Sequence, residues 1–555
     1  MSTSDVTLTL AKVLPLGALH PITLLTLLFS LAFIAYYALK KPQLSLPVIQ
    51  PGPGPQGVFQ TLKETYERYP DTPFLLNTSR PIVILPGELV NDVKNLPEDK
   101  VSLHSEVAID HSMAVTKVGG GTYGSELLPT VRVDLTRHTN GAIPAILEEL
   151  RFAMDVKFRD VDSKTWSTQV LFPKITEMSA LMLSRIFIGR PISRKPEWLG
   201  SAIGYTHDLM RARHALNKYP YWLRLIIGRF LPEVRQMNWH LDNGRKILLP
   251  IVEDLVRKAG ALDQPKEQEA SMTQQQMLED EQAPEFDDEQ GTFCSWLLKY
   301  QLRPSNATAS DIATSLALNQ LALSWVSIHS VTFAVTRAIY DLTTEPEYFE
   351  PLRQEIEEVL KKDGFQTDSQ GRRIMERTSY VKLRKLDSFL KESMRLCPNK
   401  IVNMARIVKE PVTLSTGHVL PAGTRIGIPV YSIHTSASRN QSYANFPGVA
   451  PADAFDGFRF SKLREQPGNE NKYQYVTITS DYLAWGAGTH ACPGRFFSST
   501  CIKVLFVELL RFWDFRLVGD KDAKGGPPIG HRIMDFTMTT DVTVPLEIRR
   551  REGAT

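Results

Sequence analysis

The stretch Trp485-Gly-Ala-Gly-Thr-His-Ala-Cys-Pro-Gly-Arg-Phe-Phe497 is the most informative part of this 555-residue chain. It places Cys492 in a glycine-rich turn that Pro493 and Gly494 close, directly before a long helical pattern. Backbone N–H groups and the N-terminus of a helix both stabilise a thiolate. A lone buried cysteine is more often an inert part of a core. Here the glycines let the backbone approach a large flat group, so the surroundings favour a metal-binding thiolate.

This segment resembles the haem-binding loop of cytochromes P450, commonly written Phe-x-x-Gly-x-Arg-x-Cys-x-Gly. Gly488, Cys492 and Gly494 match that pattern, whereas Trp485 replaces the Phe and His490 replaces the Arg. The resemblance implies a haem b cofactor with Cys492 as the axial thiolate ligand of its iron, a ligand that favours O–O cleavage. It also implies that the loop residues named here contact the haem.

Two further motifs follow the order of the family. Glu392-Ser-Met-Arg395 places two opposite charges three residues apart on one helix face, close enough to pair. It resembles the Glu-x-x-Arg of the family, and Phe455-Asp-Gly-Phe-Arg-Phe460 resembles the Pro-Glu-Arg-Phe region. The resemblance implies a buried structural triad of Glu392, Arg395 and Arg459. Taken alone, Arg459 reads equally well as a surface arginine.

A long apolar pattern from Ser310 to Asp341 predicts a helix that is buried all round, with Ser310 as its N-cap. Within it, His329 and Ser330 occupy the places where the family carries an acid followed by Thr, which relays protons during catalysis. Ser330 keeps a hydroxyl group, and an imidazole can titrate near neutral pH. We therefore expect His329 and Ser330 to be catalytic, with a hydrogen-bonded core histidine as the alternative for His329.

Haem propionates require cations, and the resemblance places Arg406 and His490 at such positions. The Trp-x-x-x-Arg that the family often has in an earlier helix is absent from this sequence. Arg137 or His138 is the candidate substitute for its arginine.

The N-terminal region predicts a membrane anchor over residues 1–41. Val13 to Leu39 contains no Asp, Glu, Lys or Arg, and a bilayer core needs about 20 apolar residues in a helix. Lys40 and Lys41 follow at once, which predicts that the rest of the chain is cytosolic. The expected location is therefore a single-pass position in the endoplasmic reticulum membrane. A cleaved signal peptide is the alternative.

Composition shifts divide the rest of the chain. Five prolines alternate with glycines in residues 42–58, which predicts a semi-rigid hinge. The resemblance covers residues 59–549, the expected haem domain, and residues 550–555 form a tail. Residues 263–290 contain ten acidic residues and one lysine, which predicts a disordered surface insertion, with a regulatory segment as the alternative.

The remaining patterns predict helices at Val381–Leu396 and Phe496–Trp513, the second amphipathic, and a small hairpin at Leu414–Pro429. Short strands are expected near both ends. The predicted fold class is thus mainly α with a small β-rich region. The resemblance implies the cytochrome P450 fold, preceded by one transmembrane helix.

Composition excludes several other classes. Sixty-four basic and 61 acidic residues give a net charge of +3, which lends no support to a nucleic-acid partner. Four cysteines without a Cys-x-x-Cys pair argue against a disulfide scaffold and a zinc ribbon. A hydrophobic fraction of 43% suits a globular core.

The spelling of the cysteine loop resembles microsomal P450s of filamentous-fungal secondary metabolism, with the ent-kaurene-oxidase-like group most similar. This implies a mono-oxygenase that oxidises an apolar terpenoid or indole intermediate with O₂. Its electrons would come from NADPH through a cytochrome P450 reductase, with cytochrome b5 as a second candidate donor. Two alternatives stay open: a reductase-independent haem-thiolate isomerase or dehydratase, and a haem-binding sensor or carrier without turnover.

Overall fold

The computed structural model describes most of the chain from residue 45 onward. The described residues are 45–54, 56–118, 127–259, 287, 291–301, 308–437, 443, 446–519, 529–534 and 536–553, with scattered residues between Thr23 and Phe33. Almost all of the predicted acidic insertion and of the predicted anchor lies outside them. Within the described part, no helix is long and apolar enough to cross a membrane.

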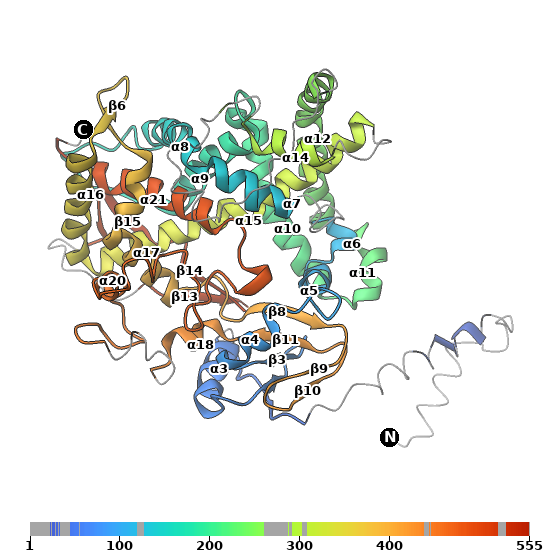
Figure 1. Cartoon of the computed structure of the whole chain (residues 1–555). Coiled ribbons are helices and arrows are strands. Elements are labelled where there is room, and N and C mark those ends of the chain that lie inside the picture. Colours follow the sequence, from blue (N-terminus) through green and yellow to red (C-terminus); the bar gives the residue numbers. More distant parts are fainter. Residues whose placement is uncertain are drawn as a thin grey trace.

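Helices form the larger part of the molecule, and α15 (Ala309–Thr344) runs through the middle of them (Figure 1). It packs against α9, α10, α12, α17 and α21, so it contacts most of the helical layer. The other helices are α3 (Gly57–Arg68), α4 (Val90–Val93), α5 (Leu103–Asp110), α6 (Met113–Thr116), α7 (Leu127–Pro129), α8 (Thr136–Lys157), α9 (Leu171–Ile188), α10 (Pro196–Asn217), α11 (Tyr221–Gly228), α12 (Pro232–Ala259), α14 (Phe293–Gln301), α16 (Phe349–Asp363), α17 (Arg384–Leu396), α18 (Val430–Thr435), α20 (Arg459–Arg464) and α21 (Arg495–Phe512). Shorter turns are η2 (Gly87–Leu89), η3 (Thr130–Leu135, a π-helix), η4 (Ile192–Arg194), η5 (Pro346–Tyr348), η6 (Arg377–Lys382) and η7 (Gly488–His490).

The start of α15 differs from the prediction. Thr308, not Ser310, is the N-cap, because its hydroxyl accepts the N–H of Asp311 while the Asp311 carboxylate accepts the N–H of Thr308. This capping box satisfies two N–H groups that the helix leaves without partners. Burial all round also fails at the middle of the helix, where Val326 and Ser330 are exposed. These two residues face a cavity that is described below.

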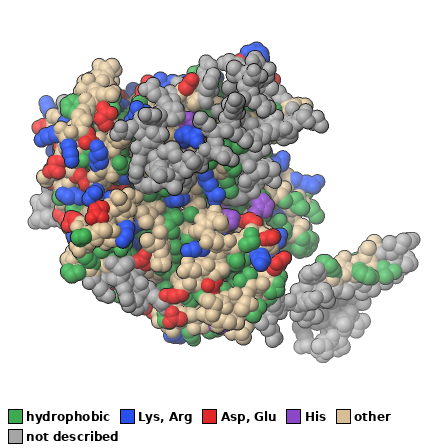
Figure 2. Space-filling model, viewed as in Figure 1, with side chains coloured by type: hydrophobic (Ala, Val, Ile, Leu, Met, Phe, Trp, Pro, Cys, Tyr) green, Lys and Arg blue, Asp and Glu red, His purple; other side chains and the backbone are tan. Residues whose placement is uncertain are grey.

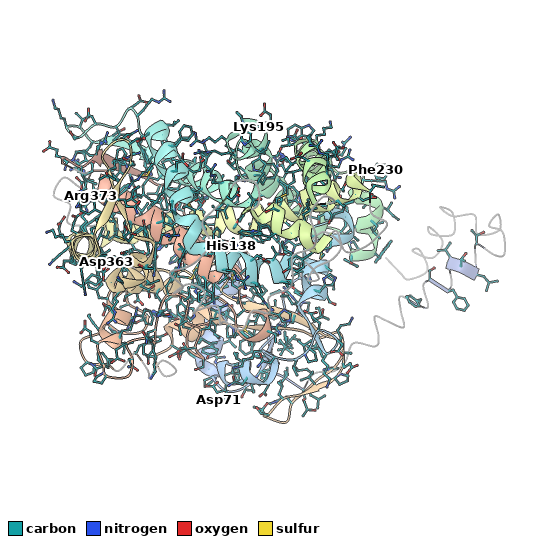
Figure 3. All side chains as sticks on the ribbon, turned by 45° about the horizontal axis from the view of Figure 1, so that its top comes forward. Asp71, His138, Lys195, Phe230, Asp363 and Arg373 are labelled. Carbon is teal, nitrogen blue, oxygen red and sulfur yellow. The ribbon has the colours of Figure 1, made fainter. Side chains whose placement is uncertain are left out.

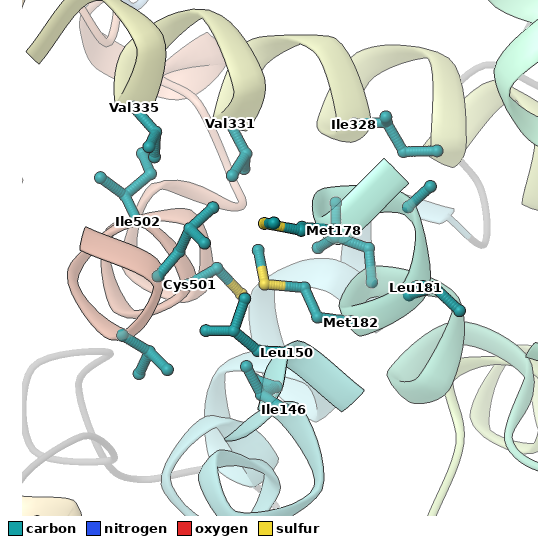
Figure 4. Packing of buried hydrophobic residues seen from close by; sticks show 14 of the residues in the cluster. Ile146, Leu150, Met178, Leu181, Met182, Ile328, Val331, Val335, Cys501 and Ile502 are labelled. Atoms are coloured by element: carbon teal, nitrogen blue, oxygen red, sulfur yellow. The ribbon is translucent and has the colours of Figure 1, made fainter. Parts of the chain in front are cut away.

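The core under α15 is built from four helices (Figure 4). Val331 and Val335 of α15 meet Met178 and Met182 of α9, with residues of α8 and α21 closing the cluster. Cys501 lies inside this cluster and is fully buried. Because α21 is surrounded in this way, nearly all of its residues are buried, and the prediction that it is amphipathic was wrong. Its apolar residues cover every face rather than one stripe.

The largest sheet among the described residues has six strands and lies on the lower side of the view in Figure 1. Its order is β1-β2-β3-β11-β8-β4, with parallel pairs at β1–β2 and β3–β11 and antiparallel pairs elsewhere. The strands of this sheet are β1 (Val48–Ile49), β2 (Phe74–Leu76), β3 (Ile82–Ile84), β4 (Val101–Ser102), β8 (Asn403–Val408) and β11 (Arg425–Ile428). A second sheet joins β12 (Trp513–Leu517), β15 (Pro545–Arg550) and β5 (Ser167–Val170). Three two-stranded sheets pair β6 (Phe365–Thr367) with β7 (Arg373–Met375), β9 (Val412–Thr413) with β10 (Val419–Leu420), and β13 (His531–Met534) with β14 (Thr537–Thr540).

Two predicted boundaries shift. The hairpin predicted at Leu414–Pro429 is formed by β9 and β10, while β11 leaves it and joins the large sheet. The predicted hinge at residues 42–58 is not wholly outside the body, because Val48 and Ile49 pair with Leu75 and Leu76. Proline-rich sequence excludes a helix there, but it does not exclude an extended edge strand.

Among the described side chains on the face in Figure 2, acidic and basic residues are interspersed, and neither sign covers a broad area. This distribution agrees with the small net charge of the sequence.

Candidate functional site

The cysteine loop is held by a short network of backbone hydrogen bonds. The N–H of Cys492 donates to the carbonyl oxygen of Trp485 at 2.7 Å, and the turn η7 fills the space between them. The indole N–H of Trp485 donates to the carbonyl oxygen of Tyr475 at 2.8 Å, which fixes the start of the loop. The loop therefore has a fixed shape that presents one sulfur just before α21.

Gly488 is the most constrained position of the loop. Its φ is +69°, and a Cβ there would lie 2.2 Å from the carbonyl oxygen of Lys94. Gly486 also has a positive φ, of +73°, but a Cβ there would meet nothing closer than 3.6 Å. Gly494, by contrast, has a negative φ and serves as the N-cap of α21. Of these three, only Gly488 is required by both φ and space.

Cys492 faces a cavity of about 1310 Å³, and the other three cysteines do not line it. Burial raises the pKa of its thiol, while the N–H groups of Gly494 and Arg495 and the charge of Arg495 oppose that shift. Burial raises the pKa of Cys294 to about 12 and that of Cys397 to about 11. Because burial outweighs the donors at Cys492, the loop alone favours the thiol, and a bound metal cation would be needed to stabilise the thiolate and release the proton to solvent.

α15 forms a wall of the same cavity through Val326, Ser330 and Val331. The hydroxyl of Ser330 donates to the carbonyl oxygen of Val326 at 2.7 Å. Its oxygen lone pairs can still accept a hydrogen bond from a donor in the cavity. The structure thus brings Ser330 and Cys492 to one space.

His329 points elsewhere. It does not line the cavity, and its ring lies near Phe172 of α9, His207 of α10 and Phe333 of its own helix. Burial, with a smaller effect of His207, lowers the pKa of His329 to about 4. The imidazole is therefore neutral at neutral pH, and it lacks the contact with the cavity that a proton relay requires.

Two of the predicted propionate ligands lie at the cavity. Arg406, on β8, is buried, and its Nε has no hydrogen-bond partner among the described residues. His490 lines the cavity beside it, with Nε2 3.2 Å from the Glu98 carboxylate. A buried guanidinium without a carboxylate is costly unless an anion binds it. This orphaned donor, together with the thiol and the cavity, fits a haem whose propionates Arg406 and His490 would hold.

Neither Arg137 nor His138, the candidates for the missing Trp-x-x-x-Arg arginine, lies at the cavity, and Arg132, which contacts the cysteine loop, does not line it either. His138 stacks on Trp296 at 4.3 Å and lies among the packed helices (Figure 3). Arg132 instead donates to the carbonyl oxygen of Thr489 in the cysteine loop. Because η3 is a π-helix, the helical phase changes between Arg132 and Arg137, which spacing alone does not reveal.

Glu392, Arg395 and Arg459 form one cluster whose side chains are fully buried. Arg395 donates to both Glu392 oxygens at 2.7 and 2.8 Å, and Arg459 donates to them at 3.1 and 3.2 Å. The remaining guanidinium N–H groups donate to main-chain carbonyl oxygens of His434, Ala450, Pro451, Ala452 and Ala454. None of the three lines the cavity, so the cluster holds α17, α20 and the 450–454 segment together.

His434, which sequence reasoning missed, connects this cluster to the cysteine loop. Its Nδ1 bonds the carbonyl oxygen of Arg395 at 2.9 Å, and its Nε2 accepts the N–H of Leu483 at 2.9 Å. Burial lowers the pKa of His434 to about 3, which keeps the ring neutral, as an acceptor at Nε2 requires. Its only signal in the sequence is a histidine directly after the stretch Val430–Ile433, three of whose four residues are apolar or aromatic.

Comparisons with known proteins agree with this geometry. The family model described as Cytochrome P450 matches residues 234–529. Cytochrome P450 monooxygenase ascG of Acremonium egyptiacum is 39% identical over 537 residues, covering 95% of each chain. Cytochrome P450 monooxygenase BOA7 of Botryotinia fuckeliana is 33% identical, covering 92% of this chain and 90% of its own. For cytochrome P450 monooxygenase gliF of Aspergillus fumigatus the identity is 32%, covering 86% of each. The chain therefore belongs to the cytochrome P450 mono-oxygenases, a family of oxidoreductases.

Proposed function

We propose that this protein is a membrane-anchored mono-oxygenase that inserts oxygen into an apolar part of a secondary-metabolite intermediate of the terpenoid or indole class. Its electrons come from NADPH through a cytochrome P450 reductase. The observation that carries this proposal is the cavity that Cys492, Ser330 and Arg406 share. It combines a candidate haem ligand, a hydroxyl and an anion-binding cation around a space large enough for a haem and a small molecule.

The haem supplies O₂ activation when it is bound through Cys492. The protein's own residues bind, orient and exclude water. Val331, Met394 and Ile502 give apolar contacts to the substrate. Arg406 and His490 would hold the haem propionates, and the oxygen of Ser330, whose O–H donates to Val326, would accept a hydrogen bond and so position a proton donor in the cavity. The catalytic role predicted for His329 is not retained, because its ring packs away from the cavity.

The ligand assignment is tested by the carbon monoxide difference spectrum of the reduced protein. Wild type is expected to absorb at the wavelength typical of thiolate haem, and Cys492→Ala to lose that band. Cys501→Ala is the control, because Cys501 is fully buried in the helical core. Loss of the band in Cys501→Ala but not in Cys492→Ala would overturn the assignment.

The reaction is tested by turnover with a purified reductase. We expect products one oxygen atom heavier than the terpenoid or indole substrate, and only when NADPH, O₂ and the reductase are all present. A product of unchanged mass that forms without reductase would instead identify an isomerase. A spectrally intact protein that turns over no candidate substrate would favour the haem-carrier alternative.

A further inference from the structure

Part of the cavity lining is strongly basic rather than apolar. Apart from the apolar residues near Cys492, the cavity is lined by charged side chains from α5, α10, α11, the β2–β3 turn and β11. We name the residues Arg80, Arg213, Arg224, Arg425, Glu106 and Asp110 the arginine cluster. All six line the cavity.

Within this cluster, three arginines share two carboxylates. Asp110 accepts two hydrogen bonds from Arg213, at 2.9 and 3.0 Å, and one from Arg80 at 3.2 Å. Glu106 accepts one from Arg80 at 2.7 Å and one from Arg425 at 2.8 Å. The five side chains therefore form one connected network that carries one positive charge in excess.

Arg224 adds a second excess charge. Its guanidinium donates to the carbonyl oxygens of Ile109 and Tyr219 and to the hydroxyl of Ser112. No carboxylate among the described residues contacts it, although it is 94% buried (6% exposed). Removing a cation from water without a counter-ion is costly, and a bound anion offsets that cost.

The pKa values of Asp110 and of the neighbouring His111 agree with a positive electrostatic potential at the arginine cluster. Burial alone would raise the pKa of Asp110, but Arg213, with His111 and Arg80, lowers it to about 2. His111 lies 3.5 Å from Asp110, yet burial together with the charges of Arg213 and Lys400 lowers the pKa of its imidazole to about 4. A histidine beside a carboxylate ordinarily gains a proton more easily.

We infer that the substrate is amphipathic and carries a carboxylate that the arginine cluster binds, while its apolar part lies toward Cys492. Arginine binds carboxylates through two parallel hydrogen bonds, and such charge-assisted bonds are about twice as strong as neutral ones. A wholly apolar substrate would bury these cations without offering them a partner. That the apolar part of the substrate is oxidised rests on the proposed function. Binding of the carboxylate by the arginine cluster does not depend on turnover.

The test uses a matched pair of probes, dodecanoate and dodecanamide, which differ only in the charge of the head group. The full-length, haem-loaded protein is titrated with each probe, and affinity is measured by calorimetry and by the change in haem absorbance. We expect dodecanoate to bind about tenfold more tightly than the amide, the ratio that about one charge-assisted hydrogen bond gives. Added salt is expected to weaken dodecanoate binding and to leave amide binding unchanged.

Arg80→Gln is the decisive variant. It removes one excess charge but leaves Asp110 with Arg213 and Glu106 with Arg425, so no carboxylate loses its last partner. Arg372→Gln is the matched control, because Arg372 also bridges two carboxylates, Asp368 and Asp155, and does not line the cavity.

In Arg80→Gln the preference for the acid is expected to fall severalfold, whereas Arg372→Gln keeps the wild-type ratio. Equal affinity of wild type for both probes, independent of salt, would overturn the inference. So would an equal loss of both probes in Arg80→Gln with an unchanged thermal midpoint. A wild type with the thiolate spectrum but no preference for the acid would refute this inference alone and leave the proposed function standing.

Discussion

Gly488 and Gly486 separate two reasons why a loop needs glycine. Both have a positive φ, which costs any other residue about 1–2 kcal/mol. Only Gly488 also lies against the backbone of Lys94, so Gly488→Ala must displace either the loop or the 94–95 segment. We expect Gly486→Ala to lower thermal stability modestly and to keep the haem spectrum, and Gly488→Ala to lose most of its haem. Equal haem content in both variants would show that the close approach to Lys94 is unimportant.

Ser330 is expected to act in proton delivery, since its hydroxyl lies at the cavity wall. General acid–base groups contribute about 10²–10⁴-fold in rate. Because a water can replace a serine hydroxyl, we expect the rate of product formation in Ser330→Ala to fall by about 10²-fold or less. The clearer effect is uncoupling: NADPH consumption continues while peroxide rises and product falls. Measuring peroxide per NADPH checks this. Unchanged coupling would remove the proton-delivery role.

His329 is expected to affect stability instead of coupling. Burial holds its pKa at about 4, below the value of about 6.5 in an unfolded chain. The unfolded state therefore binds the proton first as pH falls, and stability is lost between pH 6.5 and 4, by up to about 2–3 kcal/mol. His329→Leu should flatten the decline of the denaturation midpoint over that range and leave peroxide per NADPH unchanged. A change in coupling would restore the relay hypothesis for this residue.

Two ion pairs, one on α17 and one on α10, allow the effect of burial on the strength of an ion pair to be tested at the scale of the element. Glu392 and Arg395 on α17 and Asp208 and Arg211 on α10 are both spaced i, i+3, but the first pair is fully buried and Arg211 is exposed. Breaking a buried pair costs about 3–5 kcal/mol, and an exposed one about 0–1. We expect Arg395→Ala to lower haem incorporation and soluble yield, and Arg211→Ala to leave both unchanged. A stable, fully haem-loaded Arg395→Ala protein would contradict a structural role for the cluster.

The sequence predicted those elements whose signal is local. The helices at α15, α17 and α21 and the β9–β10 hairpin follow from spacing and turn residues, and the cysteine loop follows from its glycines. The side-chain directions could not be predicted in the same way. His329 and Ser330 are adjacent, yet only Ser330 faces the cavity, because one residue turns a helix by about 100°. The roles of Arg132 and His434 depend on contacts between segments far apart in the chain, which no local pattern encodes.

At the scale of the whole molecule, the boundary between the N-terminal segment and the body is set by β1. Leu46 is buried in a core cluster, β1 pairs with β2, and the N–H of Gly52 donates to the hydroxyl of Thr61 at 2.9 Å. The body thus begins before the predicted position near residue 59. Two N-terminal deletions, one that ends before β1 and one that ends after it, test this boundary.

Deleting residues 1–41 is expected to release much of the protein from membranes and to leave the haem spectrum and thermal midpoint unchanged. Deleting residues 1–55 also removes β1 and the buried side chain of Leu46, whose apolar contacts contribute about 1–3 kcal/mol. The longer deletion should therefore lower the thermal midpoint while the carbon monoxide spectrum stays that of thiolate haem, because Gln50 and Pro51 are the only described residues of the deleted segment that line the cavity and neither is a proposed haem contact. Equal midpoints would show that β1 adds nothing to stability. Loss of haem from the shorter deletion would show instead that residues 1–41 pack against the body.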